Sequence, residues 1–289
     1  MNKKENVRIE MIMKQLQEGV NQVYETDQWK QYLKVMSRFH TYSSANTILI
    51  YRQKRDATYV AGYQTWKNKF KRYVKKGEKA IHILAPVHKV VEEDKEGEKK
   101  YRIIGFRPVN VFDISQTSGQ ALPAYMSSEM EGTVMDYDNF IQKLMSVSPV
   151  PVQFGPLKGS MHGCYNPISH SIMIQDSMSE IQTVKTLLHE ITHALLHGSH
   201  QSDLPREVKE IEAESTAYAV CSYFHIDTSE YSFPYIAGWS QDCTWEDLKP
   251  SLDSIRYASD YLIASIKNEQ FCTNTERSLL SAGTTGQYV

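Results

Sequence analysis

Two histidines and a glutamate lie close together in the stretch TLLHEITHALLHG, residues 186–198. His189 and His193 are four residues apart, so on a helix their imidazoles lie one turn above each other and reach a single ion. Glu190 follows His189 directly and lies near enough to hydrogen-bond a water on that ion. The spacing therefore predicts a Zn²⁺ site in which His189 and His193 are ligands and Glu190 is the catalytic acid and base.

A catalytic zinc site needs a third protein ligand and one open position. The stretch PREVKEIEAESTAYAVCSYF predicts a second long helix just after the motif, and it carries three neighbouring glutamates. Glu210 and Glu214 share one face of that helix, whereas Glu212 points elsewhere and is expected in solvent. Either Glu210 or Glu214 is the third ligand, and the other orients a histidine. His197, one turn beyond the second histidine, is expected to be a bystander.

The elements expected to position these residues divide the chain into two α+β domains, residues 1–126 and 127–289. Periodicity and turn residues predict a second-half order of helix, strands, and three further helices near 136–147, 151–178, 179–197, 205–224 and 244–267. In the first half they predict helices over 5–24 and 29–39 and from Ser43 or Ser44, then a hairpin of strands near 80–91 and 101–112. The stretch SQTSGQALPAYMSSEMEGT is typical of a linker. The last dozen residues are typical of a frayed tail.

Charge separates the two halves. Residues 1–120 hold 23 Lys and Arg against 13 Asp and Glu, and residues 121–289 hold 9 against 21. A basic half is what a polyanion binder requires. Between Trp66 and Lys79, cations alternate with aromatic residues, a combination that suits unpaired bases. The alternative is a solvated basic helix, because Trp66, Phe70 and Tyr73 also have the spacing of a buried stripe.

The quoted motifs resemble known families. HEITHALLH followed by EIEAESTAYAVC is similar to the gluzincin-type metallopeptidase domains of the ImmA/IrrE and ArdC-like families. That resemblance implies that Glu210 is the third ligand and that Glu214 orients a ligating histidine without touching the ion. Glu214 stands where ImmA/IrrE-type proteins usually have Asn.

YSSANTILIYRQ, VKKGEKAIHILAPV and VFDISQTSGQALP resemble the N-terminal domain of ArdC-type antirestriction proteins of conjugative elements, a domain associated with single-stranded DNA binding. The similarity implies DNA-facing roles for Arg38, Tyr42, Asn46, Trp66, Lys75, Lys76 and Lys79.

These observations together predict a cytoplasmic protein. No apolar run reaches the roughly 18 residues of a membrane span, and the charged N-terminus is unlike a signal peptide. The expected partners are single-stranded DNA and an unknown protein substrate, with no membrane. The expected function is that of a DNA-binding zinc peptidase, an antirestriction or establishment factor of a mobile element. Two alternatives remain: a DNA-binding module with a structural or inactive zinc site, and a repressor-cleaving regulatory protease.

Overall fold

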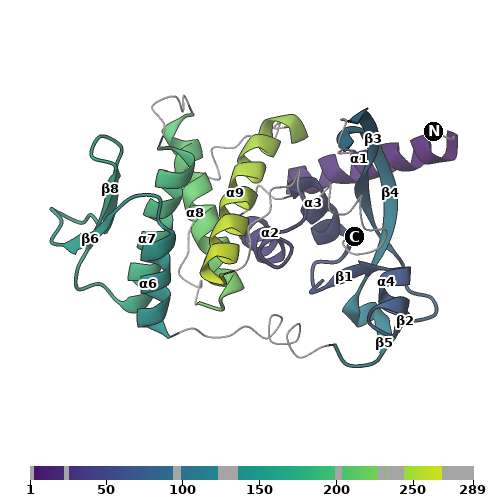
Figure 1. Ribbon diagram of the computed structural model, residues 1–289, viewed down its shortest axis with the longest axis horizontal. Coiled ribbons are helices and arrows are strands. Elements are labelled where there is room, and N and C mark those ends of the chain that lie inside the picture. The colour runs from purple at the N-terminus through teal and green to yellow at the C-terminus, as the bar shows by residue number, and fades with distance from the viewer. Residues whose placement is uncertain are drawn as a thin grey trace. The chain divides into compact units, whose positions relative to one another are not determined.

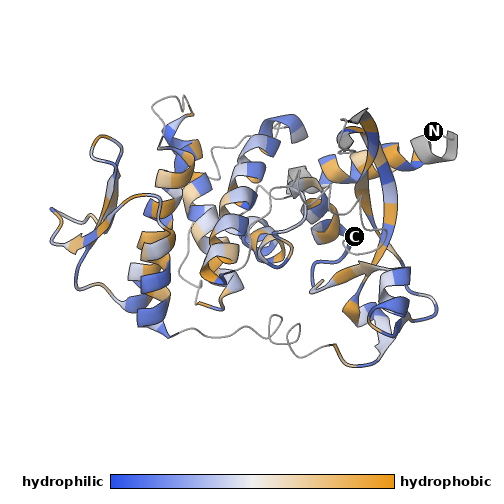
Figure 2. Ribbon diagram, viewed as in Figure 1, coloured by the Kyte–Doolittle hydropathy of each residue, from blue (hydrophilic) through white to orange (hydrophobic). Residues whose placement is uncertain are grey.

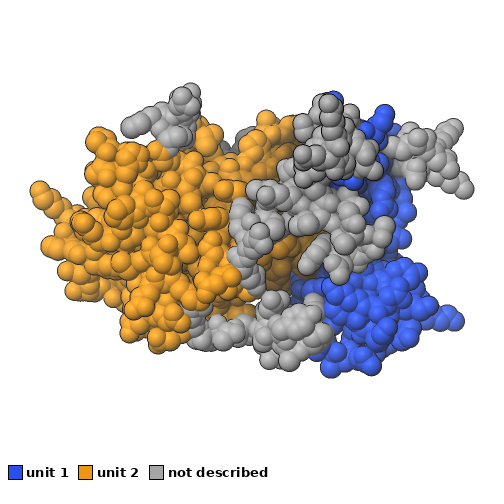
Figure 3. Space-filling view, in the orientation of Figure 1, with its two compact units in different colours: residues 1–19, 45–124, 272–289 blue, residues 20–44, 125–271 orange. Residues whose placement is uncertain are grey.

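The structure is a computed structural model that describes residues 3–22, 26–93, 99–122, 136–198, 204–226, 233 and 244–268. Its contacts divide the chain into two compact units (Figure 3). The first unit comprises residues 1–19, 45–124 and 272–289, and the second comprises residues 20–44 and 125–271. None of the described helices is long and apolar enough to cross a bilayer.

The first unit combines helices with two small antiparallel sheets. Strand order is β1-β4-β3 in one sheet and β2-β5 in the other. The long β3–β4 pair is the expected hairpin, and α1 lies against α3, where Glu18 forms an ion pair with Arg52. The elements are α1 (Lys3–Gln22), α3 (Ser44–Gln53), β1 (Val60–Gly62), α4 (Tyr63–Asn68), β2 (Arg72–Val74), β3 (Ile81–Glu93), β4 (Lys99–Asp113), the 3-10 helix η1 (Ile114–Gln116) and β5 (Thr117–Gly119).

The start of the expected linker is wrong, because Thr117–Gly119 forms β5 and pairs with β2. The buried carboxylate of Asp113 explains the change of direction at the end of β4. It accepts hydrogen bonds from the backbone N–H groups of Thr58, Tyr59 and Ser115, and so holds the chain in a turn. Most of the remaining linker, residues 123–133, lies outside the described residues, as does the expected tail.

The second unit is mainly helical, with a three-stranded sheet of order β6-β8-β7. Helix α7 packs on β7 and β8, and α8 packs on α7, α9 and α2 (Figure 1). Figure 2 shows apolar residues recurring along these helices between polar ones, as expected where one face is buried. The elements are α2 (Thr26–Arg38), α6 (Tyr137–Val147), β6 (Val152–Gly155), β7 (Gly163–Asn166), β8 (Ser171–Gln175), α7 (Glu180–Leu196), α8 (Arg206–Tyr223) and α9 (Trp245–Ile266).

Helix α2 belongs to the second unit, although the expected division at residue 126 assigned it to the first domain. Its residues Trp29, Leu33 and Met36 are fully buried, and the Trp29 indole donates a hydrogen bond to the Ser215 hydroxyl on α8. Just beyond α2, His40 pairs with the buried Asp260 of α9 at 2.8 Å. Burial of this stripe favours packing with the helices of the second unit.

Candidate metal centre

Helix α7 presents the two histidines of the motif toward one point. It begins after Ser179, whose hydroxyl accepts a hydrogen bond from the Gln182 N–H, and its buried face is apolar, including Leu187, Leu188 and Ile191. His189 and His193 lie on adjacent turns of this helix, and their Nε2 atoms are 3.0 Å apart. The buried helix therefore holds two nitrogen donors in register.

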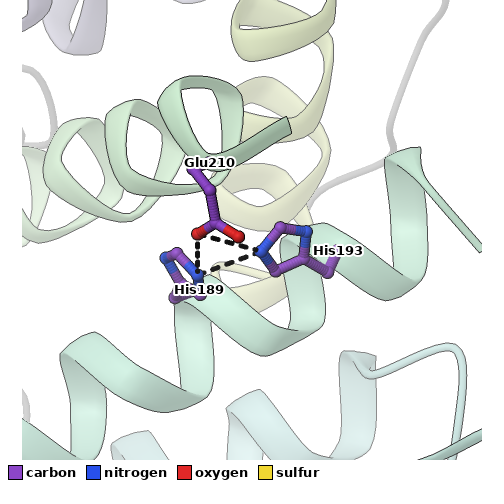
Figure 4. A group of neighbouring side chains, drawn as sticks. All are labelled: His189, His193 and Glu210. Atoms are coloured by element: carbon purple, nitrogen blue, oxygen red, sulfur yellow. Dashed lines mark hydrogen bonds and ion pairs between the residues drawn. The ribbon is translucent and has the colours of Figure 1, made fainter. Parts of the chain in front are cut away.

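Glu210 on α8 completes the cluster (Figure 4). Its Oε2 lies 3.4 Å from Nε2 of His189 and 3.8 Å from Nε2 of His193. Ligands at about 2.1 Å from a tetrahedral zinc ion lie about 3.4 Å from one another, which follows from the tetrahedral angle. The three observed separations bracket that value, so these side chains fit a tetrahedral ion with three protein ligands.

Glu190 is buried and held by the sheet. Its Oε2 accepts a hydrogen bond of 2.6 Å from the Tyr165 N–H of β7. Gly163, also on β7, permits the close approach: a Cβ there would lie 2.5 Å from Thr186 and 3.0 Å from Cγ of Glu190. Burial raises the pKa of Glu190, while His189 and the Tyr165 N–H oppose the shift. A carboxylate with a raised pKa beside this group of possible metal ligands suits proton transfer.

The pKa values of the three side chains in the cluster are shifted in different directions. Burial lowers the pKa of His189, but the hydrogen bond to Glu210 and the nearby carboxylates outweigh it, so this pKa lies above its ordinary value. Burial also lowers the pKa of His193, and here the decrease prevails. The neighbouring imidazoles of His189 and His193 hold the pKa of Glu210 well below its usual range. An anionic oxygen therefore faces both nitrogens.

Glu214 lies one turn beyond Glu210 on α8. Burial raises its pKa to about 7, against the opposing charge of His189. Its Oε2 is buried without a hydrogen-bond partner among the described residues. Glu214 therefore interacts with His189 through its charge, and its role in orienting that histidine stays a prediction.

His197 and Glu212 differ from what the sequence indicated. Nδ1 of His197 lies 2.9 Å from Nδ1 of His193, and its Nε2 lies 3.0 Å from Oε2 of Glu212. Their side chains are only 4% and 2% exposed, so Glu212 is not in solvent and His197 is not a bystander. The spacing of four residues from His193 to His197 was the available signal, but the partner on α8 depends on how the two helices pack.

Two of the residues expected to face DNA are buried. Trp66 is fully buried and its indole donates to the Phe112 carbonyl. The Asn46 side chain bonds both the N–H and the carbonyl of Leu84, which covers the free edge of β3. Both side chains are used inside the first unit, so their burial does not support the expected contact with DNA, which stays a prediction.

The other expected DNA contacts lie at the surface. Lys75, Lys76 and Lys79 are exposed in the loop between β2 and β3, Arg38 is exposed in the second unit, and Tyr42 is partly buried. The basic stretch is not one helix, since α4 ends at Asn68 and a strand follows. The buried stripe therefore stops at Phe70, and Tyr73 on β2 is 53% exposed.

Comparison with known proteins finds a separate family model that matches part of each half of the chain. Residues 3–112 match the N-terminal domain of the anti-restriction factor ArdC, and residues 148–222 match the IrrE N-terminal-like peptidase domain. The chain therefore contains a region similar to the ArdC N-terminal domain, followed by a region similar to the IrrE-type peptidase domain. An uncharacterized protein of Bacillus anthracis is 29% identical over 248 residues, which cover 72% of this chain and 42% of the relative's length.

Two solved structures share the fold of this chain. The metal-free structure of the antirestriction ArdC protein from plasmid R388 matches with a TM-score of 0.54 at 22% identity, over 79% of this chain and 86% of that chain. The Mn(II)-bound structure of the same protein matches with a TM-score of 0.51 at 18% identity and the same coverage. The IrrE-like match contains both histidines of the motif and Glu210, whereas the ArdC-type match ends just before Asp113. The predicted ArdC and IrrE resemblance and the two-domain α+β architecture are thereby confirmed.

Proposed function

We propose that the IrrE-like domain is a zinc-dependent peptidase and that the ArdC-type domain binds single-stranded DNA, so that the protein acts as an antirestriction factor. One observation carries the enzymatic part: His189, His193 and Glu210 have the mutual distances of a three-ligand tetrahedral site, with the Glu190 carboxylate beside it. A site that only stabilised the fold would have no use for a buried carboxylate with a raised pKa.

Each residue of the site has a defined task in this proposal. Zinc, when bound, supplies Lewis-acid chemistry that makes a water nucleophilic near neutral pH and polarises the scissile carbonyl. The Tyr165 N–H holds Oε2 of Glu190, which leaves Oε1 to take a proton from the attacking water. The raised pKa then allows Glu190 to give the proton to the departing amine.

Replacing Glu190 by Gln tests the enzymatic proposal. The full chain loaded with zinc should cleave a randomised fluorogenic peptide library, and Glu190→Gln should abolish cleavage while retaining one zinc per chain. Glu180→Gln, an exposed change on the same helix, serves as control and should keep full activity. If the parent protein cleaves nothing, or if cleavage survives Glu190→Gln, the site is not this kind of enzyme and a structural metal site is favoured.

The DNA-binding proposal is supported by the charge and aromatic residues around β2. Lys75, Lys76 and Lys79 can neutralise phosphates, and the exposed ring of Tyr73 can stack on an unpaired base. Gly77 has φ of +91°, which gives the loop a tight turn between the lysines. The surface is thus a short basic loop beside an exposed aromatic ring.

An oligonucleotide titration of the full chain tests this surface. Replacing Lys75, Lys76 and Lys79 by Gln should weaken binding to an unstructured oligonucleotide and reduce the salt slope by about 0.7 per lost phosphate contact. A control that replaces the exposed Lys14 and Lys158 should leave that slope unchanged. Unchanged binding by the triple variant, or tighter binding to duplex, would contradict the proposal. In cells, plasmid transfer should rise only into a host that restricts the incoming DNA.

A further inference from the structure

The imidazole of His193 has a defined neighbour at each nitrogen. Nε2 faces the proposed ion position, 3.0 Å from Nε2 of His189 and 3.8 Å from Oε2 of Glu210. Nδ1 points the other way and lies 2.9 Å from Nδ1 of His197. Only Nε2 is therefore placed to bind a metal.

Behind His193, His197 and Glu212 form a buried pair from two helices. His197 follows the last residue of α7, and Glu212 lies in the second turn of α8. The separation from Nε2 of His197 to Oε2 of Glu212 is 3.0 Å, and almost no solvent reaches either side chain. A carboxylate without a partner at such a site would strongly destabilise the fold, so this hydrogen bond must be kept.

The direction of both hydrogen bonds follows from the donor and acceptor chemistry. A carboxylate accepts and does not donate, so Nε2 of His197 donates to Glu212. With His197 in its neutral form, its single N–H is the one on Nε2, so Nδ1 of His197 accepts and its partner Nδ1 of His193 donates. The proton of His193 is thereby fixed on Nδ1, and the lone pair of Nε2 points at the proposed ion.

We propose that His197 and Glu212 are positioning residues that fix the tautomer and the ring orientation of His193 for metal binding. The inference rests on the proposed metal site and adds to it two residues that do not touch the ion. Hydrogen-bonded partners behind a ligating histidine typically affect metal affinity about 10- to 100-fold. Glu212 acts through His197, so the hydrogen bonds run from Glu212 on α8 through His197 to His193 on α7.

The first test reads the tautomers of the parent protein directly. Full-length protein with ¹⁵N-labelled histidines, free of metal, should show His193 in the Nδ1–H form and His197 in the Nε2–H form in long-range ¹H–¹⁵N spectra. The single substitution His197→Asn assigns the signals. An Nε2–H form of His193, or averaging between the two forms, would overturn the proposal.

The second test measures zinc affinity by competition with a chromophoric chelator. His197→Leu should weaken binding roughly 10- to 100-fold, and His197→Asn, whose amide oxygen can accept from Nδ1 of His193, should recover part of the loss. Val184→Ala, a buried change on the same helix, controls for lost stability and should leave affinity unchanged.

The outcomes separate this inference from the proposed function. If the parent protein binds no zinc, the metal site itself is wrong and the inference fails with it. If the parent binds zinc and His197→Leu binds it equally well, the metal site stands and only the positioning role is wrong. If His197→Leu does not fold, the tautomer spectra of the parent and the affinity of His197→Asn decide.

Discussion

Removing the carboxylate ligand by Glu210→Ala should reduce zinc affinity by a predictable amount. Structural zinc sites with four ligands contribute roughly 10–16 kcal/mol, so one ligand in four carries about 2.5–4 kcal/mol. That corresponds to roughly a hundred- to a thousandfold weaker binding. The change also removes the acceptor that raises the pKa of His189, and weaker proton competition offsets a small part of the loss.

Competition titration with a chelator of known affinity measures this loss on the full chain at a fixed pH. Glu207→Ala is the matched control, because Glu207 is exposed in the first turn of the same helix and carries the same charge. The control should keep the parent's affinity. If Glu210→Ala binds zinc as tightly as Glu207→Ala, Glu210 is not a ligand and the distance argument is wrong. If Glu214→Ala shows the full loss of zinc affinity instead, Glu214 is the third ligand.

Three further changes probe the fold of the two units. Gly163→Ala would place a methyl group 2.5 Å from Thr186, so thermal unfolding should show a loss of about 1–3 kcal/mol and peptide cleavage should fall. Gly105→Ala, where nothing lies within 4 Å, should change neither. Trp66→Phe removes a buried donor and should lower stability by about 1–3 kcal/mol without changing oligonucleotide affinity. Weaker oligonucleotide binding with unchanged stability would instead support a contact between Trp66 and DNA. Since the pKa of Glu214 is raised to about 7, the folded metal-free protein holds a proton that the unfolded chain releases from its ordinary pKa of 4.5 upward. Stability therefore falls as pH rises through this window, and Glu214→Gln should flatten the melting temperature against pH; an unchanged slope would refute the shift.

Much of the local structure was predictable because it depends on neighbours in sequence. The motif helix, the helix bearing Glu210 and the β3–β4 hairpin lie within a few residues of their expected bounds. Helical periodicity and caps such as Ser179 act within one or two turns, so the sequence shows them directly. The spacing of His189 and His193 likewise needs only a helix.

The departures from expectation concern residues whose environment is set by distant parts of the chain. Trp66 and Asn46 are residue types that occur on DNA-binding surfaces. Here the Trp66 indole is hydrogen-bonded to β4, and the Asn46 amide is hydrogen-bonded to the free edge of β3. Glu212 was expected in solvent because a helix wheel gives faces without saying which face meets a neighbour. Helix α2 precedes the first sheet in sequence yet packs with the helices of the second unit, because its buried stripe fits α8.

The sequence by itself determined the pair of histidines, the adjacent glutamate and the charge difference between the halves, since each depends on residue type and short spacing. Only the tertiary structure decided how the site is built. The packing of α8 on α7 brings Glu210 within 3.4 Å of His189 and Glu212 within 3.0 Å of His197, and β7 supplies the N–H that holds Glu190. These contacts join residues 15 or more positions apart, and their geometry depends on side-chain packing between elements, which no local pattern encodes.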